Sequence, residues 1–220
     1  ERHCQLPEGQ AGFCGTRMNI DGQLYTLVYG DVSSISANPI EKKPFFHFWP
    51  GSYALTIGTW GCNFACGWCQ NFEISKYPPD PTQARFFSPE KLIEMAVAEG
   101  CRSISISFNE PTMLFEYSLD AFPIAHRRGL YNNYVSNGYM SSEALKLLRE
   151  AGMDAIKFDV KGGRKVVRRQ CAADSEVVWR NVKQAREWGL HVEVVNLLIP
   201  GINDEEECVR EVVQRHIREA

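Results

Sequence analysis

Short apolar runs alternate with amphipathic stretches along most of the chain. Runs of strand character are followed by stretches of helical period; the strands are expected at residues 53–58, 103–107, 132–136, 155–159 and 192–198, and the helices at 89–99, 112–128, 141–151, 175–189 and 204–219. A strand and a helix that alternate in this way predict right-handed crossovers and a parallel sheet. The pattern therefore predicts an α/β fold, doubly wound or curled into a barrel, with ligands at the carboxyl ends of the strands.

The first 50 residues have a different character, rich in turn formers and aromatic residues. Two short runs, residues 16–20 and 23–29, flank Asp21-Gly22 and predict a hairpin. We expect an N-terminal extension over residues 1–50 and a core domain over residues 51–220. Because the pattern stops at Ala220 inside a helical stretch without a capping signal, we also expect the core to continue past it.

Composition narrows the class of protein. The chain has 220 residues, 44% of them hydrophobic, enough for one domain with a full core. Its net charge of -3 comes from mixed acidic and basic residues without a run suited to tracking phosphates, so nucleic acid is not an expected partner. It lacks an apolar stretch of about 18 residues and a signal peptide, so we expect no membrane association and a cytoplasmic location.

Three of the eight cysteines are clustered, which favours a metal site in a reducing compartment over disulfides. Cys62, Cys66 and Cys69 follow the first predicted strand with the spacing Cys-x3-Cys-x2-Cys. Thiolates are soft ligands for iron-sulfur clusters or zinc. Three ligands leave one iron of a 4Fe-4S cluster open, able to chelate the amino and carboxylate groups of S-adenosylmethionine (SAM). A structural zinc site would need a fourth Cys or His nearby, and none follows Cys69.

The motif, with the aromatic Trp68 just before Cys69, resembles the signature of the radical SAM superfamily. Its wider context, residues 59–71, is similar to the pyruvate formate-lyase activating enzyme branch. Together with residues 12–17 and 24–30, it is most similar to the radical SAM enzyme of the AmmeMemoRadiSam system. The resemblance implies a partial (β/α)6 barrel with five strands present and the sixth missing. It also implies a 4Fe-4S cluster on the three cysteines and SAM beside it, with Trp68 against the adenine.

Polar residues at the ends of later strands are candidate SAM contacts. Asn109 and Glu110 end the second strand, where the resemblance places them near the SAM amino group; alternatively, Glu110 only begins the next helix. The candidates for the ribose, the carboxylate or other parts of the cofactor are Ser136, Asn137, Asp159, Lys161 and Asn196. Ordinary turn and cap chemistry is the alternative for these residues. Val135 replaces an Asp of the activating enzymes, so an accessory cation site is not expected.

The remaining cysteines carry weaker signals. Cys4 and Cys14 are either part of a second metal site, as the resemblance suggests, or two unpaired thiols. Cys101, Cys171 and Cys208 are interpreted as isolated thiols, and the dispersed histidines are not assigned to a metal.

The expected activity is that of an oxidoreductase-type radical enzyme. Reductive cleavage of SAM gives a 5'-deoxyadenosyl radical, which abstracts hydrogen from an unidentified protein or small molecule. By resemblance, the target includes a glycine of a partner enzyme, an electron donor such as ferredoxin or flavodoxin is required, and Memo-like and AMMECR-like proteins are expected partners. The alternative is a non-catalytic zinc or iron-sulfur interaction module, in which the three cysteines bind a metal that only stabilises their loop.

Overall fold

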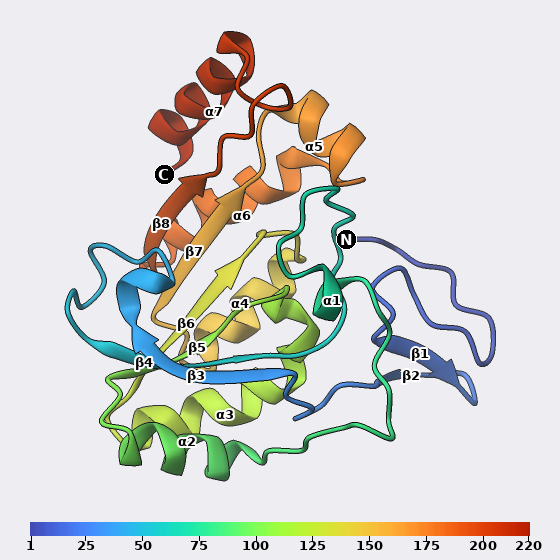
Figure 1. Ribbon diagram of the computed structural model, residues 1–220, viewed down its shortest axis with the longest axis vertical. Helices are drawn as coiled ribbons and strands as arrows, with labels where there is room; N and C mark the ends of the chain where they lie inside the picture. The colour runs from blue at the N-terminus through green and yellow to red at the C-terminus, as the bar shows by residue number, and fades with distance from the viewer.

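The structure is a computed structural model that describes all residues from Glu1 to Ala220. A two-stranded hairpin lies apart from a six-stranded sheet of order β3-β4-β5-β6-β7-β8 (Figure 1). The strands are β1 (Arg17–Ile20), β2 (Gln23–Thr26), β3 (Ser34–Pro39), β4 (Tyr53–Gly58), β5 (Ser103–Ile106), β6 (Tyr131–Ser136), β7 (Ala155–Val160) and β8 (His191–Asn196). The helices are η1 (Ile40–Lys42), α1 (Phe72–Ser75), α2 (Pro89–Ala98), η2 (Pro111–Leu114), α3 (Phe115–Arg127), α4 (Ser142–Glu150), α5 (Arg164–Gln170), α6 (Ser175–Glu187) and α7 (Glu206–Glu219).

The predicted parallel sheet is confirmed. Strands β4 to β8 pair in parallel and in chain order, so the fold is α/β with a mostly parallel sheet, consistent with a partial barrel. The sixth strand is β3, which pairs antiparallel with β4 on the outer side. Its sequence, Ser-Ile-Ser-Ala-Asn-Pro, has a weak alternation and ends in proline, so the apolar pattern did not reveal it.

Local capping and burial explain why the crossover helices form where they do. Ser88 and Ser141 are the N-cap residues of α2 and α4, and each accepts a hydrogen bond from the third backbone amide that follows it. The helices cover one face of the curved sheet (Figure 1) and bury a main core of 35 residues against it. This packing fixes the carboxyl ends of the parallel strands at one rim.

A second, smaller core covers the opposite end of the sheet. Ile40, Phe45 and Phe48 pack against Ala54 and Ala155, at the amino ends of β4 and β7. The backbone amides of Phe46 and His47 donate to the Glu193 carboxylate on β8, 2.9 Å in each case. Residues 40–50 therefore close the amino end of the partial barrel.

Some predicted boundaries differ from the structure. The predicted helix 112–128 begins as the 3-10 turn η2 and continues as α3, which contains Pro123. Helix α5 was not predicted, because its seven residues are too few to show a helical period. Strand β8 ends at Asn196 rather than at residue 198. No helix is long and apolar enough to cross a bilayer.

Candidate functional site

The cysteine motif lies on the loop that follows β4. Gly61 has φ +75°, and a Cβ atom there would lie 2.3 Å from the carbonyl oxygen of Cys14. Only glycine allows the N-terminal segment to pack this closely on the loop. On the other side, the Ala65 amide donates to the Cys171 carbonyl at 3.0 Å, and Lys76 Nζ donates to the Phe64 carbonyl at 2.9 Å. The loop is thus held between the N-terminal segment and the end of α5.

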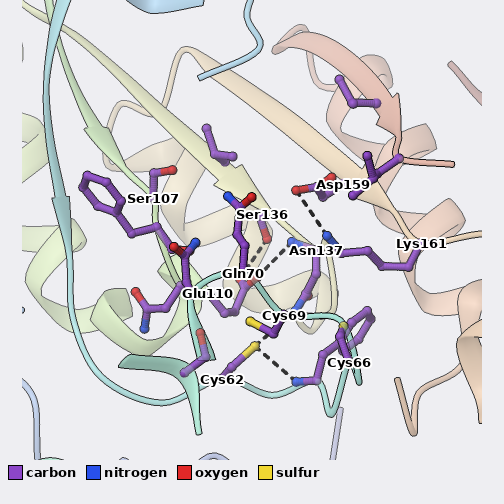
Figure 2. Close-up of a pocket in the computed structure, with 18 of the residues that line it drawn as sticks. Cys62, Cys66, Cys69, Gln70, Ser107, Glu110, Ser136, Asn137, Asp159 and Lys161 are labelled. Carbon is purple, nitrogen blue, oxygen red and sulfur yellow. Dashed lines mark hydrogen bonds and ion pairs between the residues drawn. The ribbon is translucent and has the colours of Figure 1, made fainter. Parts of the chain in front are cut away.

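The loop opens into a cavity of about 490 Å³ at the carboxyl ends of the strands. Figure 2 shows the cysteines at one side of this cavity, Glu110 and Ser107 on the β5 side, and Asp159 and Lys161 on the β7 side. The structure brings together nearly the whole predicted site: Cys62, Cys66, Trp68, Cys69, Asn109, Glu110, Ser136, Asn137, Asp159 and Lys161 all line the cavity.

Asn196 is the exception. Its side-chain amide donates to the Val160 carbonyl at 2.7 Å, and it does not line the cavity. The side chain ties the end of β8 to the end of β7 and does not reach the cavity in which a cofactor would lie. Val135 does line the cavity, but its aliphatic side chain offers no ligand to a cation.

The three thiols have different surroundings. Burial, together with the nearby Glu110, raises the pKa of Cys62 to about 12, whereas the hydrogen bond shared with Cys171 lowers the pKa of Cys66. Cys66 Sγ and Cys171 Sγ are 3.5 Å apart, so the prediction that Cys171 is an isolated thiol was wrong. Its position 102 residues beyond Cys69, outside any short motif, concealed the contact.

The donor chemistry fits a 4Fe-4S cluster. The Phe64 amide lies 3.4 Å and the Asn137 side-chain amide 3.9 Å from Cys62 Sγ, where they can support a thiolate ligand. The thiols are not gathered as a finished ligand set, since no three His, Cys, Asp or Glu side chains lie at metal-binding spacing anywhere in the structure. Cys4 and Cys14 line a separate cavity of about 400 Å³, and a second metal site there stays a prediction.

Glu110 is the buried carboxylate of the cavity, with only 2% of its surface exposed. Burial raises its pKa, against hydrogen bonds that favour the anion. Ser136 Oγ donates to Oε1 at 2.8 Å, the Asn137 amide donates to Oε2 at 2.9 Å, and both the amide and the hydroxyl of Thr112 donate to Oε1. Glu110 therefore caps η2, as the alternative interpretation of the sequence predicted. Its carboxylate also accepts hydrogen bonds from the end of β6.

The neighbouring amides brace the site. Asn109 Oδ1 accepts from the Thr59 amide at 3.1 Å, and its Nδ2 donates to the Gly61 carbonyl at 2.7 Å, which fixes the start of the cysteine loop. Asn137 Nδ2 donates to Asn63 Oδ1 at 2.8 Å. Trp68 is half-buried and packs against the main core while it lines the cavity.

A charged triad lies on β7 and just beyond it. Asp159 is 3.0 Å from Lys157 Nζ and 3.3 Å from Lys161 Nζ. Although burial opposes ionisation, the two lysines hold the pKa of Asp159 below its usual range. Burial lowers the pKa of Lys157, whereas Asp159 outweighs burial at Lys161 and raises its pKa. The triad places one carboxylate and two ammonium groups beside the cysteines.

The cavity residues that sequence reasoning missed include Lys43, Phe108 and Lys157. Lys157 alternates with Asp159 on one strand, so the period of two could have placed both side chains on the inner face. Phe108 follows β5 with φ +68°, which its sequence does not signal. Lys43 belongs to the segment that was assigned to the extension.

A mostly parallel α/β partial barrel with three closely spaced cysteines at its cavity defines a cofactor-binding class of fold. Residues 56–212 match the radical SAM superfamily, and the chain belongs to that superfamily. An uncharacterized protein of Methanocaldococcus jannaschii is 42% identical over 203 residues, covering 92% of this chain and 60% of the relative. The chain thus spans about three fifths of that relative's length. The GTP 3',8-cyclase of Aliarcobacter butzleri is 23% identical over 150 residues, covering 66% of this chain and 46% of the cyclase.

Solved structures agree with the fold. SuiB of Streptococcus suis, bound to S-adenosylmethionine, matches with a TM-score of 0.59 at 13% identity, over 76% of this chain and 39% of SuiB. The AdoMet-bound structure of anSMEcpe matches with a TM-score of 0.53 at 15% identity, over 73% of this chain and 46% of that one. At these identities the likeness shows the fold alone, and the resemblance to the AmmeMemoRadiSam branch stays a prediction.

Proposed function

We propose that the chain is a radical SAM enzyme that binds a 4Fe-4S cluster through Cys62, Cys66 and Cys69 and cleaves SAM reductively. One observation carries the proposal: the three cysteines of a superfamily match open into the same cavity as Glu110 and the Asp159 triad. When bound, the cluster and SAM together supply an electron transfer that yields the 5'-deoxyadenosyl radical.

The side chains of the cavity have separable tasks in this proposal. Glu110, held in place by Ser136 and Asn137, offers negative charge to the SAM ammonium. Lys161 lies near Cys66 and Asp159, where its positive charge offsets thiolate charge. Asp159 is available to accept hydrogen bonds from the ribose hydroxyls, and the polar end of β6 is available to the SAM carboxylate. Trp68 and Phe64, on the cysteine loop, supply apolar surface that excludes water.

Anaerobic reconstitution tests the proposal. We expect iron and sulfide to bind at the motif and dithionite with SAM to give 5'-deoxyadenosine. Cys66→Ala should abolish both results, because it removes one of three ligands. The matched control is Cys101→Ala, which removes a buried thiol beside β5 that does not line the cavity. Iron-free protein with stoichiometric zinc would instead support the non-catalytic interaction module.

The substrate and partners are further proposals. The resemblance to activating enzymes suggests hydrogen abstraction from a glycine of a partner protein, and a small molecule is the other possibility. Memo-like and AMMECR-like proteins are partners to test by co-purification.

For the electron donor, an acidic ferredoxin or flavodoxin, we propose docking at α5. This helix carries four exposed basic residues and no acidic one: Arg164, Lys165, Arg168 and Arg169. None of the four forms an ion pair, although the rest of the chain has more acidic than basic residues. Cys171, which ends α5, lies against Cys66.

A further inference from the structure

One positive charge in the cavity has no counterpart. Lys43 follows η1 in the segment that closes the amino end of the partial barrel, and only 6% of its surface is exposed. Its side chain lines the cavity that the cysteines also line. Its Nζ forms no hydrogen bond or ion pair with the protein. Nζ lies over the face of the Phe108 ring, 4.5 Å from its centroid.

The other charges of the cavity are satisfied. Lys157 and Lys161 both pair with Asp159, and Glu110 accepts hydrogen bonds on both carboxylate oxygens. Lys42, the neighbour of Lys43, also lines the cavity, but its side chain is exposed and its Nζ lies 3.4 Å from Asn38 Oδ1. Lys43 is therefore the buried charged group of the cavity whose partner the protein does not supply.

Such a lysine is costly to the fold. A buried ammonium loses hydration, and burial together with the positive charge of Lys42 lowers its pKa to about 8. A methionine would fill the same space without that cost. Contact with an aromatic face recovers only part of the lost hydration.

Phe108, the aromatic residue beside Lys43, has an energetically unfavourable backbone conformation. Phe108 has φ +68°, a conformation that a bulky residue rarely adopts. Gly58, at the end of β4, leaves the room for it, since a Cβ atom there would lie 2.8 Å from Phe108 Cβ. Two unfavourable features, a strained aromatic residue and an unpaired cation, meet at one point of the cavity wall.

We infer that Lys43, seated against Phe108, binds a carboxylate or phosphate group of the substrate within the cavity. The inference rests on the proposed function in that it names the chemical class of the molecule on which that site acts. Lys43 lies on the segment that covers the amino ends of the strands, whereas the cysteines follow the carboxyl end of β4. Both line the same cavity, so an anionic group held by Lys43 would anchor the substrate with its remainder in the space that the cysteines also line.

Calorimetric titration of the reconstituted, SAM-loaded protein tests the inference. The probes are inorganic phosphate and malonate, with methylammonium as a cationic control, in a buffer free of other multivalent anions. We expect phosphate or malonate to bind with a Kd of roughly 1 mM or tighter. Lys43→Met should weaken this binding by about tenfold or more, the usual loss for a charge-assisted hydrogen bond. Which probe binds distinguishes a phosphate from a carboxylate substrate.

Two matched variants complete the design. Lys91→Met removes the same charge from an exposed position on α2 that does not line the cavity, and it should change binding by less than about twofold, since exposed charges are screened. Lys43→Arg keeps the charge and should retain part of the binding. Lys43→Met should also raise the Tm by about 2–4 °C or more, because it removes an uncompensated buried charge. A lysine with a purely structural role would instead lower the Tm when removed.

The results separate this inference from the proposed function. Failure of both anions to bind the wild-type protein, equal binding by Lys43→Met, or a lower Tm for that variant would overturn the inference. Formation of 5'-deoxyadenosine, assayed in parallel without substrate, reports on the proposed function independently. Anion binding that depends on Lys43 without SAM cleavage would support the site and overturn the proposed function.

Discussion

Glu110 is the residue on which the proposed SAM site depends most. Its carboxylate is buried, and its hydrogen-bond donors come from the end of β6 and from η2. Glu110→Gln keeps the shape but removes the negative charge, and its amide would meet at least one of these donors. We expect SAM affinity to fall about 10- to 100-fold, as for the loss of a charge-assisted hydrogen bond, with unchanged iron content.

The measurement is SAM binding to reconstituted protein, with iron and sulfide determined on the same samples. Glu94→Gln on the exposed side of α2 is the matched control, because it changes the same charge far from the cavity. Wild-type affinity in a folded, cluster-loaded Glu110→Gln protein would leave Glu110 as the cap of η2 only.

Lys43 gives the fold a characteristic dependence on pH. Its pKa lies near 8 in the folded protein, below the ordinary value of 10.5 that we take for the unfolded chain. Below pH 8 both states are protonated, and the folded state bears the full cost of the buried charge. Between pH 8 and 10.5 the unfolded state binds more protons, so stability rises with pH. The Tm advantage of Lys43→Met should therefore be largest near pH 7 and shrink by pH 9.5.

Thermal unfolding of the two proteins across this range measures the effect, and the difference between them cancels other groups that titrate. A constant Tm difference from pH 7 to 9.5 would show that Lys43 does not titrate in this window.

Gly61 tests the packing of the N-terminal segment on the cysteine loop. Gly61→Ala places Cβ against the Cys14 carbonyl and the Thr16 methyl group, at a positive φ. We expect a loss of about 2–4 kcal/mol in the free energy of unfolding, from steric overlap and backbone strain. The control is Gly67→Ala on the same loop, where a Cβ would meet nothing within 4 Å. Denaturant titration should show little change for Gly67→Ala, and equal losses would place the strain elsewhere.

The sequence predicted which single residues lie at the cavity where the topology of the fold fixes their positions. The ends of successive parallel strands meet at one rim, so Glu110, Asn137 and Asp159 could be brought together from the sequence. Asn196 satisfies the same rule, yet its side chain turns to the Val160 carbonyl. A strand position fixes the backbone but not the rotamer, which depends on the nearest unpaired acceptor.

At the scale of elements, helix α5 ends beside the cysteine loop and carries basic but no acidic side chains. If the electron donor docks there, Arg168→Glu with Arg169→Glu should slow reduction of the cluster by ferredoxin or flavodoxin about tenfold or more at low salt. Reduction by dithionite should be much less affected, because it is small and does not need the surface. Anaerobic stopped-flow absorbance, repeated at several salt concentrations, measures both rates.

The control pair is Arg127→Glu with Arg128→Glu. These exposed arginines also end a helix, α3, but precede the amino end of β6 rather than the cysteine loop. Equal slowing by both pairs would show a general effect of net charge and would remove α5 as the docking surface.

Elements were predictable in proportion to their length and their apolar period. The ten-residue helix α2 shows a Ser cap, an apolar stripe and a terminal Gly, and its predicted bounds are nearly those observed. The short helix α5 carries its basic residues around a single buried Val167, too little to define a period. Strand β3 has no fully buried side chain, so its pairing with β4 depends on backbone hydrogen bonds that the sequence does not signal.

For the whole molecule, the alternation of strands and helices was enough to predict a parallel sheet, but not how its two ends are closed. The amino end is covered by residues 40–50, whose aromatic residues pack under β4 and β7. Their spacing has no strand or helix period, so their role became visible only when the strands had been placed. The predicted division at residue 50 stays untested as a domain boundary, although β3 joins the main sheet.

The other end of the sheet order leads to the last prediction. Strand β8 pairs with β7 on one side, and in this chain no strand pairs with its other side. Leu197 and Leu198 follow it, and each is at least half exposed. An outer strand with apolar residues beside it is a template for pairing between chains. We therefore expect the chain to self-associate as its concentration rises from about 1 to 100 µM, the range in which exposed strand edges associate.

Leu198→Lys, which adds a charge outside the cavity, should shift the protein to monomer because like charges oppose edge-to-edge pairing. The control Ile217→Lys charges an exposed apolar residue of α7 and should have less effect. Sedimentation velocity of the three proteins decides the matter: a wild-type monomer throughout, or an equal response to both lysines, would show that the edge of β8 does not drive association.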